Sequence, residues 1–407
     1  MTRDTSDRAR RSLVSARALR NAARSPVWLA AAIPLAWYPL LTMPGRRWSD
    51  FASFYAAGSL AFGPGTIDER AILAFQQAHG LAPTPFLYPP AVALLYVPFA
   101  WLAYDAAGVL NVALQAAALL GAALLGSRVY GIPLGWAILG TAAWAPAAVG
   151  VITGQNSALF LLLTVAATAA LAGSRWRLAG VVLGAATYRP QLGFPLVALA
   201  GWRRAWGAGA TVFAALAIQY VLGIAATGGM LNWPAGWARS IAAETPVDFT
   251  AAGWQALSLP GMLSRLSLAG SQPGSVIGPA LAGYAVATAV ILRGLGSLRS
   301  WDAQHAVALA CTLALFAGPR GWSYDGTMLL PAVAVLAREA AGSPAARGLR
   351  RLIALAYLVV LCWPLGASVG VNPEALVVLA APFVLLRVGS LSRWAPPAGG
   401  PPSAATG

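Results

Sequence analysis

Apolar runs recur along the whole chain and constrain its fold more than any other feature. They follow one another from Val27 to Val388, and most are close to the ~20 residues that a helix needs to cross ~30 Å of hydrocarbon. Of the 407 residues, 58% are hydrophobic and only 10% are charged, which is far from the composition of a soluble domain. The sequence therefore predicts an all-α polytopic membrane protein.

The apolar pattern predicts about 12 membrane helices. One pair of runs is too short for two full crossings at 1.5 Å per residue. We interpret this pair as a V of two short helices, broken at Arg189-Pro190 because proline lacks the backbone donor that a continuous helix needs. The predicted helices are 27–43, 107–127, 132–150, 157–173, 178–188, 190–200, 207–227, 275–292, 302–317, 325–337, 352–369 and 374–387.

Residues 44–106 form the first of two predicted outer loops and contain short helical candidates at 50–62, 67–79 and 88–104. The last candidate has two possible placements: a full crossing, or a re-entrant or interfacial helix. We favour the re-entrant placement because it puts 20 of the 27 basic residues, all of them arginine, on the cytoplasmic side, as the positive-inside rule requires. Both chain termini are then cytoplasmic.

The remaining segments complete the predicted domain organisation. Residues 1–26 form a basic cytoplasmic N-terminus, which is too long for the charged region of a cleaved signal peptide and lacks a cleavage site. Residues 27–388 form the multi-spanning domain, and residues 389–407 are a disordered cytoplasmic tail. The second outer loop, 228–273, contains Trp233, Trp237 and Trp254, which suit a membrane interface or stacking on a sugar.

Seven arginines oppose the topological bias, and two of them are candidates for binding an anion. Arg189 interrupts an apolar run, where a charge is costly unless it faces a cavity, an anion or a paired carboxylate. A guanidinium there can bind a phosphate through two parallel hydrogen bonds. Arg320 lies in the turn Gly318–Asp325, where a local ion pair with Asp325 is the alternative.

Asp50 stands just beyond the first apolar run and precedes Phe51, Phe54 and Tyr55. A side chain at this position can cap a helix that begins at Phe51. A carboxylate at a membrane surface is also what glycosyl transfer needs to take a proton from an acceptor hydroxyl. The two roles are compatible, and Asp50 is the candidate general base.

Three further polar side chains interrupt apolar surroundings. Tyr88 precedes Pro89-Pro90, so it either forms a rigid entry turn or presents its hydroxyl to a cavity beside Asp50. Gln155 and Asn156 join two predicted crossings. Asn156 is explained equally well by a helix cap, but an amide such as Gln155 at membrane depth needs a partner.

Several classes of function find no support in the sequence. His79 and His305 stand alone, so no metal site is expected, and there is no P-loop. Cys311 and Cys362 lie within apolar runs and imply no disulfide framework. The net charge of +15 is explained by membrane topology, so nucleic acid is not an expected partner. No cofactor is expected either.

Several of these motifs, taken together and in order, resemble glycosyltransferase family 87. They are Ser49-Asp50-Phe51, Phe54-Tyr55-Ala56-Ala57-Gly58, Phe86-Leu87-Tyr88-Pro89-Pro90, Gly154-Gln155-Asn156, Tyr188-Arg189-Pro190-Gln191 and Tyr324-Asp325. The resemblance implies the C-type glycosyltransferase fold, a polyprenyl-phosphate sugar donor, and Asp50 as the catalytic carboxylate. Where the family commonly has Lys, this chain has Arg189, which keeps the charge but not the geometry. Ser49 stands where some C-type transferases have a second acidic residue.

The resemblance and the residues together predict an inverting transferase of a bacterial plasma membrane, with its site facing outward. It would move a sugar, with mannose favoured, from a polyprenyl phosphate to a lipid or glycan acceptor. The alternative is a flippase for lipid-linked sugars. Arg189 and Arg320 are the expected phosphate-binding residues, and the expected substrate-binding residues are Tyr55, Tyr88, Gln155, Asn156, Gln191, Tyr324 and Asp325.

Overall fold

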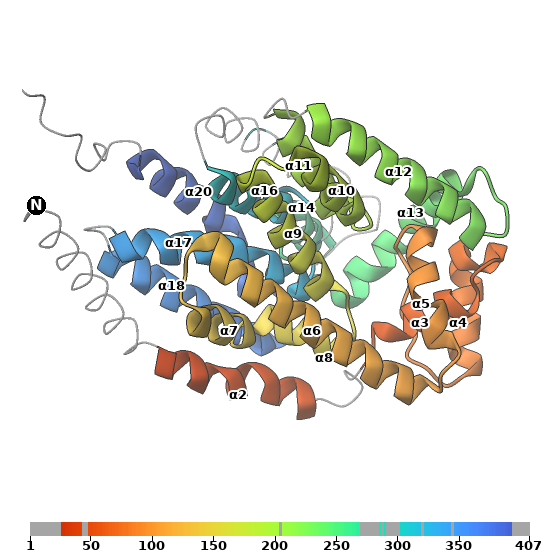
Figure 1. Cartoon of the computed structure of the whole chain (residues 1–407). Coiled ribbons are helices and arrows are strands. Elements are labelled where there is room, and N and C mark those ends of the chain that lie inside the picture. The colour runs from red at the N-terminus through yellow and green to blue at the C-terminus, as the bar shows by residue number, and fades with distance from the viewer. Residues whose placement is uncertain are drawn as a thin grey trace, which may run out of the picture.

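The computed structural model is helical throughout, which confirms the predicted all-α class (Figure 1). The structure describes residues 26–42, 48–202, 206–268, 302–318, 321–342 and 346–392, together with Ala285 and Ala289. These residues contain no β-strand. Most of the longer helices run in roughly one direction in Figure 1, and a group of short helices closes one end of the bundle.

The short helices at that end come from the first predicted outer loop. Helices α3 (Phe51–Ser59) and α5 (Ala93–Ala100) pack so closely that a Cβ on Gly58 would lie 2.6 Å from the backbone of Tyr96. The segment Pro90–Ala100 is an apolar helix only about 16 Å long at 1.5 Å per residue, which is shorter than the ~30 Å of hydrocarbon in a bilayer; its re-entrant placement stays a prediction. The elements are α3 (Phe51–Ser59), η1 (Pro64–Ile67), α4 (Glu69–Ala78), η2 (Pro90–Val92) and α5 (Ala93–Ala100).

Two described helices are long and apolar enough to cross a membrane. They are α6 (Tyr104–Tyr130) and α12 (Trp206–Ala226), and a bent pair of helices described next makes a possible third. The other apolar helices are shorter, including α2 (Pro26–Thr42) and α9 (Ser157–Ala172). The structure supports a helical membrane protein, and the number of twelve crossings stays a prediction.

The predicted crossing at 132–150 is wrong as a single helix. It consists of α7 (Leu134–Ala142) and α8 (Ala145–Thr153), which meet at an angle of 60°. Trp144 is extended at the junction, and Pro146 in the first turn of α8 has no N–H to bond back into α7. The Trp144 indole is fully buried and donates to the Gly326 carbonyl at 2.9 Å, so the bend connects this helix pair to the C-terminal half.

The predicted break at Arg189-Pro190 is confirmed, and the V shape of the two helices stays a prediction. Helix α10 (Trp176–Ala186) ends before Arg189, and α11 (Pro190–Trp202) starts at the proline. Helix α10 packs along α12 through two glycines. A Cβ on Gly180 would lie 2.0 Å from the Thr211 hydroxyl oxygen, and one on Gly184 would lie 2.4 Å from the Ala215 Cβ.

The C-terminal half surrounds one central helix, α16 (Ala303–Ala317), whose side chains are nearly all buried. Within the second predicted outer loop the structure has a helix of 20 residues, α13. The predicted crossing at 275–292 lies almost wholly outside the described residues, and α20 continues beyond Val388. The remaining elements are α13 (Trp233–Ala252), η3 (Gly253–Gln255), α14 (Leu259–Leu268), η5 (Ser323–Leu329), α17 (Leu330–Gly342), α18 (Ala346–Leu361), η6 (Trp363–Leu365), α19 (Gly366–Val369) and α20 (Glu374–Ser392).

The close contact of α10 with α12 makes a testable prediction. We expect Gly180→Ala to destabilise the protein by about 1–3 kcal/mol, because the added methyl group forces the two helices apart. Gly209→Ala on α12 is the matched control, since a Cβ there meets nothing within 4 Å. Thermal unfolding of the purified variants in detergent measures both changes. Equal melting temperatures for the two variants would contradict the packing argument.

Candidate active site

Asp50 is fixed by backbone hydrogen bonds to the last turn of α8. Its N–H donates to the Thr153 carbonyl at 2.9 Å, and the N–H of Trp48 donates to the Ile152 carbonyl at 2.8 Å. Asp50 occupies the N-cap position of α3, but its side chain makes no capping hydrogen bond. The carboxylate is half-buried. The capping role is therefore not observed, while the backbone holds Asp50 beside the turn that follows Thr153.

That turn requires a glycine at its first position. Gly154 ends α8 with a φ of +83°, in the left-handed region that residues with a side chain rarely adopt. A Cβ on Gly154 would also lie 2.5 Å from the Cβ of Phe51, the residue after Asp50. The Asn111 amide donates to the Gly154 carbonyl at 3.2 Å. Gln155 is the residue after Gly154, so it follows directly on the point where α8 meets the Asp50 segment.

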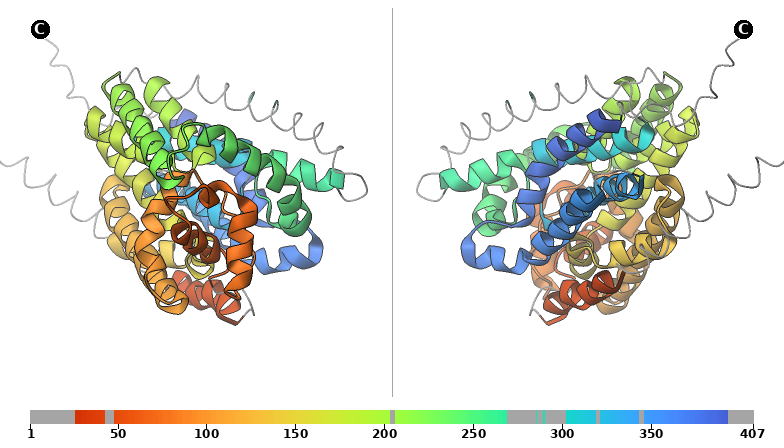
Figure 2. Two further views of the ribbon diagram at one scale, coloured as in Figure 1. Left: turned by 90° about the vertical axis from the view of Figure 1, so that its right-hand side faces the viewer. Right: turned by 90° about the vertical axis from the view of Figure 1, so that its left-hand side faces the viewer.

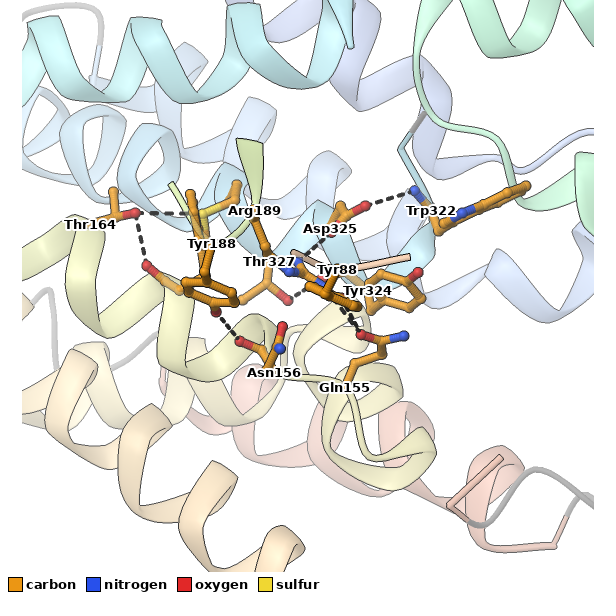
Figure 3. Close-up of polar contacts among 12 residues, drawn as sticks. Tyr88, Gln155, Asn156, Thr164, Tyr188, Arg189, Trp322, Tyr324, Asp325 and Thr327 are labelled. Carbon is orange, nitrogen blue, oxygen red and sulfur yellow. Dashed lines mark hydrogen bonds and ion pairs between the residues drawn. The ribbon is translucent and has the colours of Figure 1, made fainter. Parts of the chain in front are cut away.

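Arg189 lies at the break between α10 and α11 and is only 1% exposed. Its Nη1 forms an ion pair with the Asp325 carboxylate at 2.5 Å. Its Nη2 donates to the Tyr88 hydroxyl at 2.7 Å and to Gln155 Oε1 at 3.2 Å. Figure 3 shows the guanidinium among these side chains, which come from four separate parts of the sequence.

Two tyrosine rings flank the guanidinium. The central carbon of Arg189 lies 5.6 Å from the ring centroid of Tyr88 and 5.4 Å from that of Tyr324, within the range of a cation–π interaction. Burial raises the pKa of Tyr88 to about 12; the positive charge of Arg189 opposes this rise, and the negative charges of Asp325 and Asp50 add to it. The phenol is therefore neutral at physiological pH and donates to Gln155 Oε1 at 2.7 Å.

Both carboxylate oxygens of Asp325 accept hydrogen bonds. One carboxylate oxygen accepts from Arg189, and the other accepts from the Trp322 N–H at 3.0 Å. We call the connected side chains the Arg189 cluster, and its members are Tyr88, Gln155, Arg189, Tyr324 and Asp325. Charge is balanced within the cluster, because one buried carboxylate faces one buried guanidinium.

Comparison with known protein families identifies the chain. Residues 86–319, more than half of its length, match glycosyltransferase family 87. The chain belongs to glycosyltransferase family 87. Comparisons with curated proteins and with solved structures gave no match. The matched region contains Tyr88, Gln155 and Arg189, whereas Asp50 lies before it and Asp325 after it.

Five of the expected site residues of this family 87 protein meet in the Arg189 cluster. Asn156 lies against it, because its backbone carbonyl accepts from the Tyr188 hydroxyl at 2.9 Å. Tyr55 points elsewhere and donates to the Leu102 carbonyl at 2.8 Å. Gln191 is half-buried in the first turn of α11. Arg320 lies outside the described residues, so its predicted contacts are not tested.

The structure also adds one residue that the sequence did not point to, and it places two of the tryptophans of the second predicted outer loop. Asn111 is 1% exposed in the N-terminal third of α6 and supports the Gly154 turn; an amide in an apolar run was the available signal. Trp237 donates to the Leu87 carbonyl at 3.3 Å and so connects α13 to the segment of Tyr88. Trp233 is buried and donates to the Tyr220 carbonyl at 3.1 Å, so it belongs neither to an interfacial belt nor to a sugar platform.

The buried ion pair makes a second prediction. Arg189→Met leaves the Asp325 carboxylate buried without its cation, and we expect a loss of about 3–5 kcal/mol in stability. The double variant Arg189→Met/Asp325→Leu should be more stable than the single one, because it removes the orphaned charge. Thermal unfolding in detergent measures both effects.

A matched control for this prediction is Arg338→Met. Arg338 pairs with Asp302 at 2.8 Å, but both side chains are partly exposed, so we expect a loss of no more than about 1 kcal/mol. If Arg189→Met cost no more than the control, the Arg189 cluster would not be held together by its ion pair.

Proposed function

We propose that this family 87 protein transfers a hexose, with mannose favoured, from a polyprenyl-phosphate donor to a lipid or glycan acceptor at the outer face of a bacterial plasma membrane. The observation that carries the proposal is the position of Asp50. A half-buried carboxylate, held by its backbone to the last turn of α8, stands next to the turn that supplies Gln155 to the Arg189 cluster. Family membership favours transfer over the alternative of a flippase.

In the proposed reaction Asp50 is the general base. It takes the proton from an acceptor hydroxyl as the oxygen of that hydroxyl attacks the anomeric carbon of the donor. The bond from the anomeric carbon to the phosphate oxygen breaks with its electron pair, so the polyprenyl phosphate leaves and the configuration inverts. The exposure of the Asp50 side chain supports this role, because a base must reach the hydroxyl of a bound acceptor.

We propose that Arg189 stabilises the leaving phosphate through its positive charge and through the groups that it positions. Both of its terminal nitrogens already donate to Tyr88, Gln155 and Asp325. None of the described residues accepts a hydrogen bond from its Nε, so this N–H is one donor still available to a ligand. Arg320 is our second candidate for phosphate contact, because only one residue separates it from Trp322 in the sequence.

The general-base role is tested by Asp50→Asn. We expect the rate of sugar transfer to fall by about 10²–10⁴-fold, while expression and melting temperature stay unchanged. Membranes supplied with labelled polyprenyl-phosphate mannose and an acceptor extract provide the measurement. Asp105→Asn is the control, since Asp105 is an exposed carboxylate at the start of α6 in the same part of the chain. Transfer at the wild-type rate by Asp50→Asn would remove Asp50 from the chemistry.

The proposed orientation is tested by cysteine labelling. The background variant is Cys362→Ser, because Cys362 is exposed whereas Cys311 is buried. We expect a membrane-impermeant maleimide to label Gln77→Cys on intact cells, and to label Gly135→Cys only after permeabilisation. Both positions are exposed. The reverse pattern would show that the site faces the cytoplasm.

A further inference from the structure

The first turn of α10 lines a hollow with a strongly basic rim. The hollow has a volume of about 400 Å³ and is lined by Ser174, Arg175, Trp176, Arg177, Leu178 and Gly207. Arg175 and Arg177 are exposed, and no described carboxylate forms an ion pair with either of them. Arg203 and Arg204 precede α12 in the sequence, outside the described residues. The hollow is therefore a cationic site without an anionic partner in the described protein.

A second, separate hollow lies further along α12. It has a volume of about 260 Å³ and is lined only by Ala217, Ile218, Val221 and Leu222. Gly207 and Ile218 are eleven residues apart, which is slightly more than three turns at 3.6 residues per turn, so the two hollows lie on one face of α12. Both views in Figure 2 show α12 at the rim of the bundle, and the four residues that line the second hollow are all exposed.

Small residues line the strip of α12 surface between the two hollows, and we call this strip, with the hollows at its ends, the groove. Exposed small residues, Ala210 and Ala214, lie between them on the same face of α12. Leu178 on α10 contributes to the first hollow and is 48% exposed, and Phe213 on α12 is 74% exposed. From Gly207 to Val221 the groove is roughly 21 Å long at 1.5 Å per residue.

We propose that this groove binds one anionic phospholipid, with its phosphate on Arg175 and Arg177 and an acyl chain along α12. A basic hollow between membrane helices attracts the anionic headgroups of the cytoplasmic leaflet, and the proposed topology puts both arginines on that side. The groove is longer than the ~15 Å of hydrocarbon in one leaflet, so it is long enough for the acyl chain of a lipid in that leaflet. The headgroup end lies at the opposite end of α10 from Arg189, so the lipid is distinct from the donor of the proposed reaction.

Bound lipid would also brace the packing of α10 on α12. Gly180 and Gly184 bring the two helices into direct contact next to the groove. A phospholipid with its phosphate on α10 and its chain on α12 contacts both helices. Because Arg189 follows α10 by only a few residues, the lipid site supports the helix that positions the Arg189 cluster.

Native mass spectrometry of the purified protein in detergent tests the proposal, with phosphatidylglycerol and phosphatidylcholine of the same chain length as probes. We expect the wild type to bind one phosphatidylglycerol in preference to phosphatidylcholine. Arg175→Gln/Arg177→Gln should weaken phosphatidylglycerol binding about tenfold and leave phosphatidylcholine binding unchanged. Ala217→Phe should weaken it with both arginines intact, because the ring fills the second hollow.

The control is Arg350→Gln/Arg351→Gln, which removes two exposed arginines from α18 and should leave lipid binding unchanged. An equal loss of phosphatidylglycerol binding in the two double-arginine variants would indicate diffuse charge attraction and would overturn the proposed site. Tighter binding of a polyprenyl phosphate than of phosphatidylglycerol would overturn the identity of the lipid. Folding is checked independently: phosphatidylglycerol should raise the melting temperature of the wild type more than that of Ala217→Phe, and an equal rise would contradict the groove.

Discussion

The buried ion pair between Arg189 and Asp325 is the interaction on which the rest of the site depends. Both side chains are 1% exposed, and removing two charges from water costs several kcal/mol per ion. Such a pair is poor evidence for stability in itself. Its consequence is geometric, because the guanidinium connects the segment of Tyr88, the turn of Gln155 and the turn of Asp325, which are far apart in the chain.

The residues of the Arg189 cluster lie where helices end. Gln155 follows the end of α8, Arg189 follows the end of α10, and Asp325 lies in the 3-10 turn before α17. Irregular backbone at membrane depth is tolerated only where protein buries it or where it lines a cavity. Here the protein buries it: Trp144 donates to the Gly326 carbonyl, and Asn111 donates to the Gly154 carbonyl. The helix breaks that would otherwise expose backbone groups therefore also position the polar side chains of the cluster.

The local sequence pattern predicted much of the fold but few of the side-chain contacts between distant segments. Apolar length placed α6, α9, α12 and α16 to within a few residues, and the proline after Arg189 placed the break of the V. The bend at Trp144 was missed because the apolar run continues through it, and proline is tolerated near the start of a helix. The pairing of Asp325 with Arg189 spans 136 residues, whereas a single sequence suggests only neighbours such as Arg320 as partners.

Asp50 and Arg189 differ in exposure, and this difference fits a division of roles. A general base must reach the hydroxyl of a ligand that arrives and leaves, so some exposure of its carboxylate is a requirement. A cation that stabilises developing charge works best when it is fixed in advance and shielded from water. Asp50 is half-buried and positioned by its backbone, whereas Arg189 is buried and positioned by its side-chain partners. The fold thus leaves Asp50 partly accessible and holds Arg189 rigid, as the proposed transfer from a lipid-linked phosphate requires.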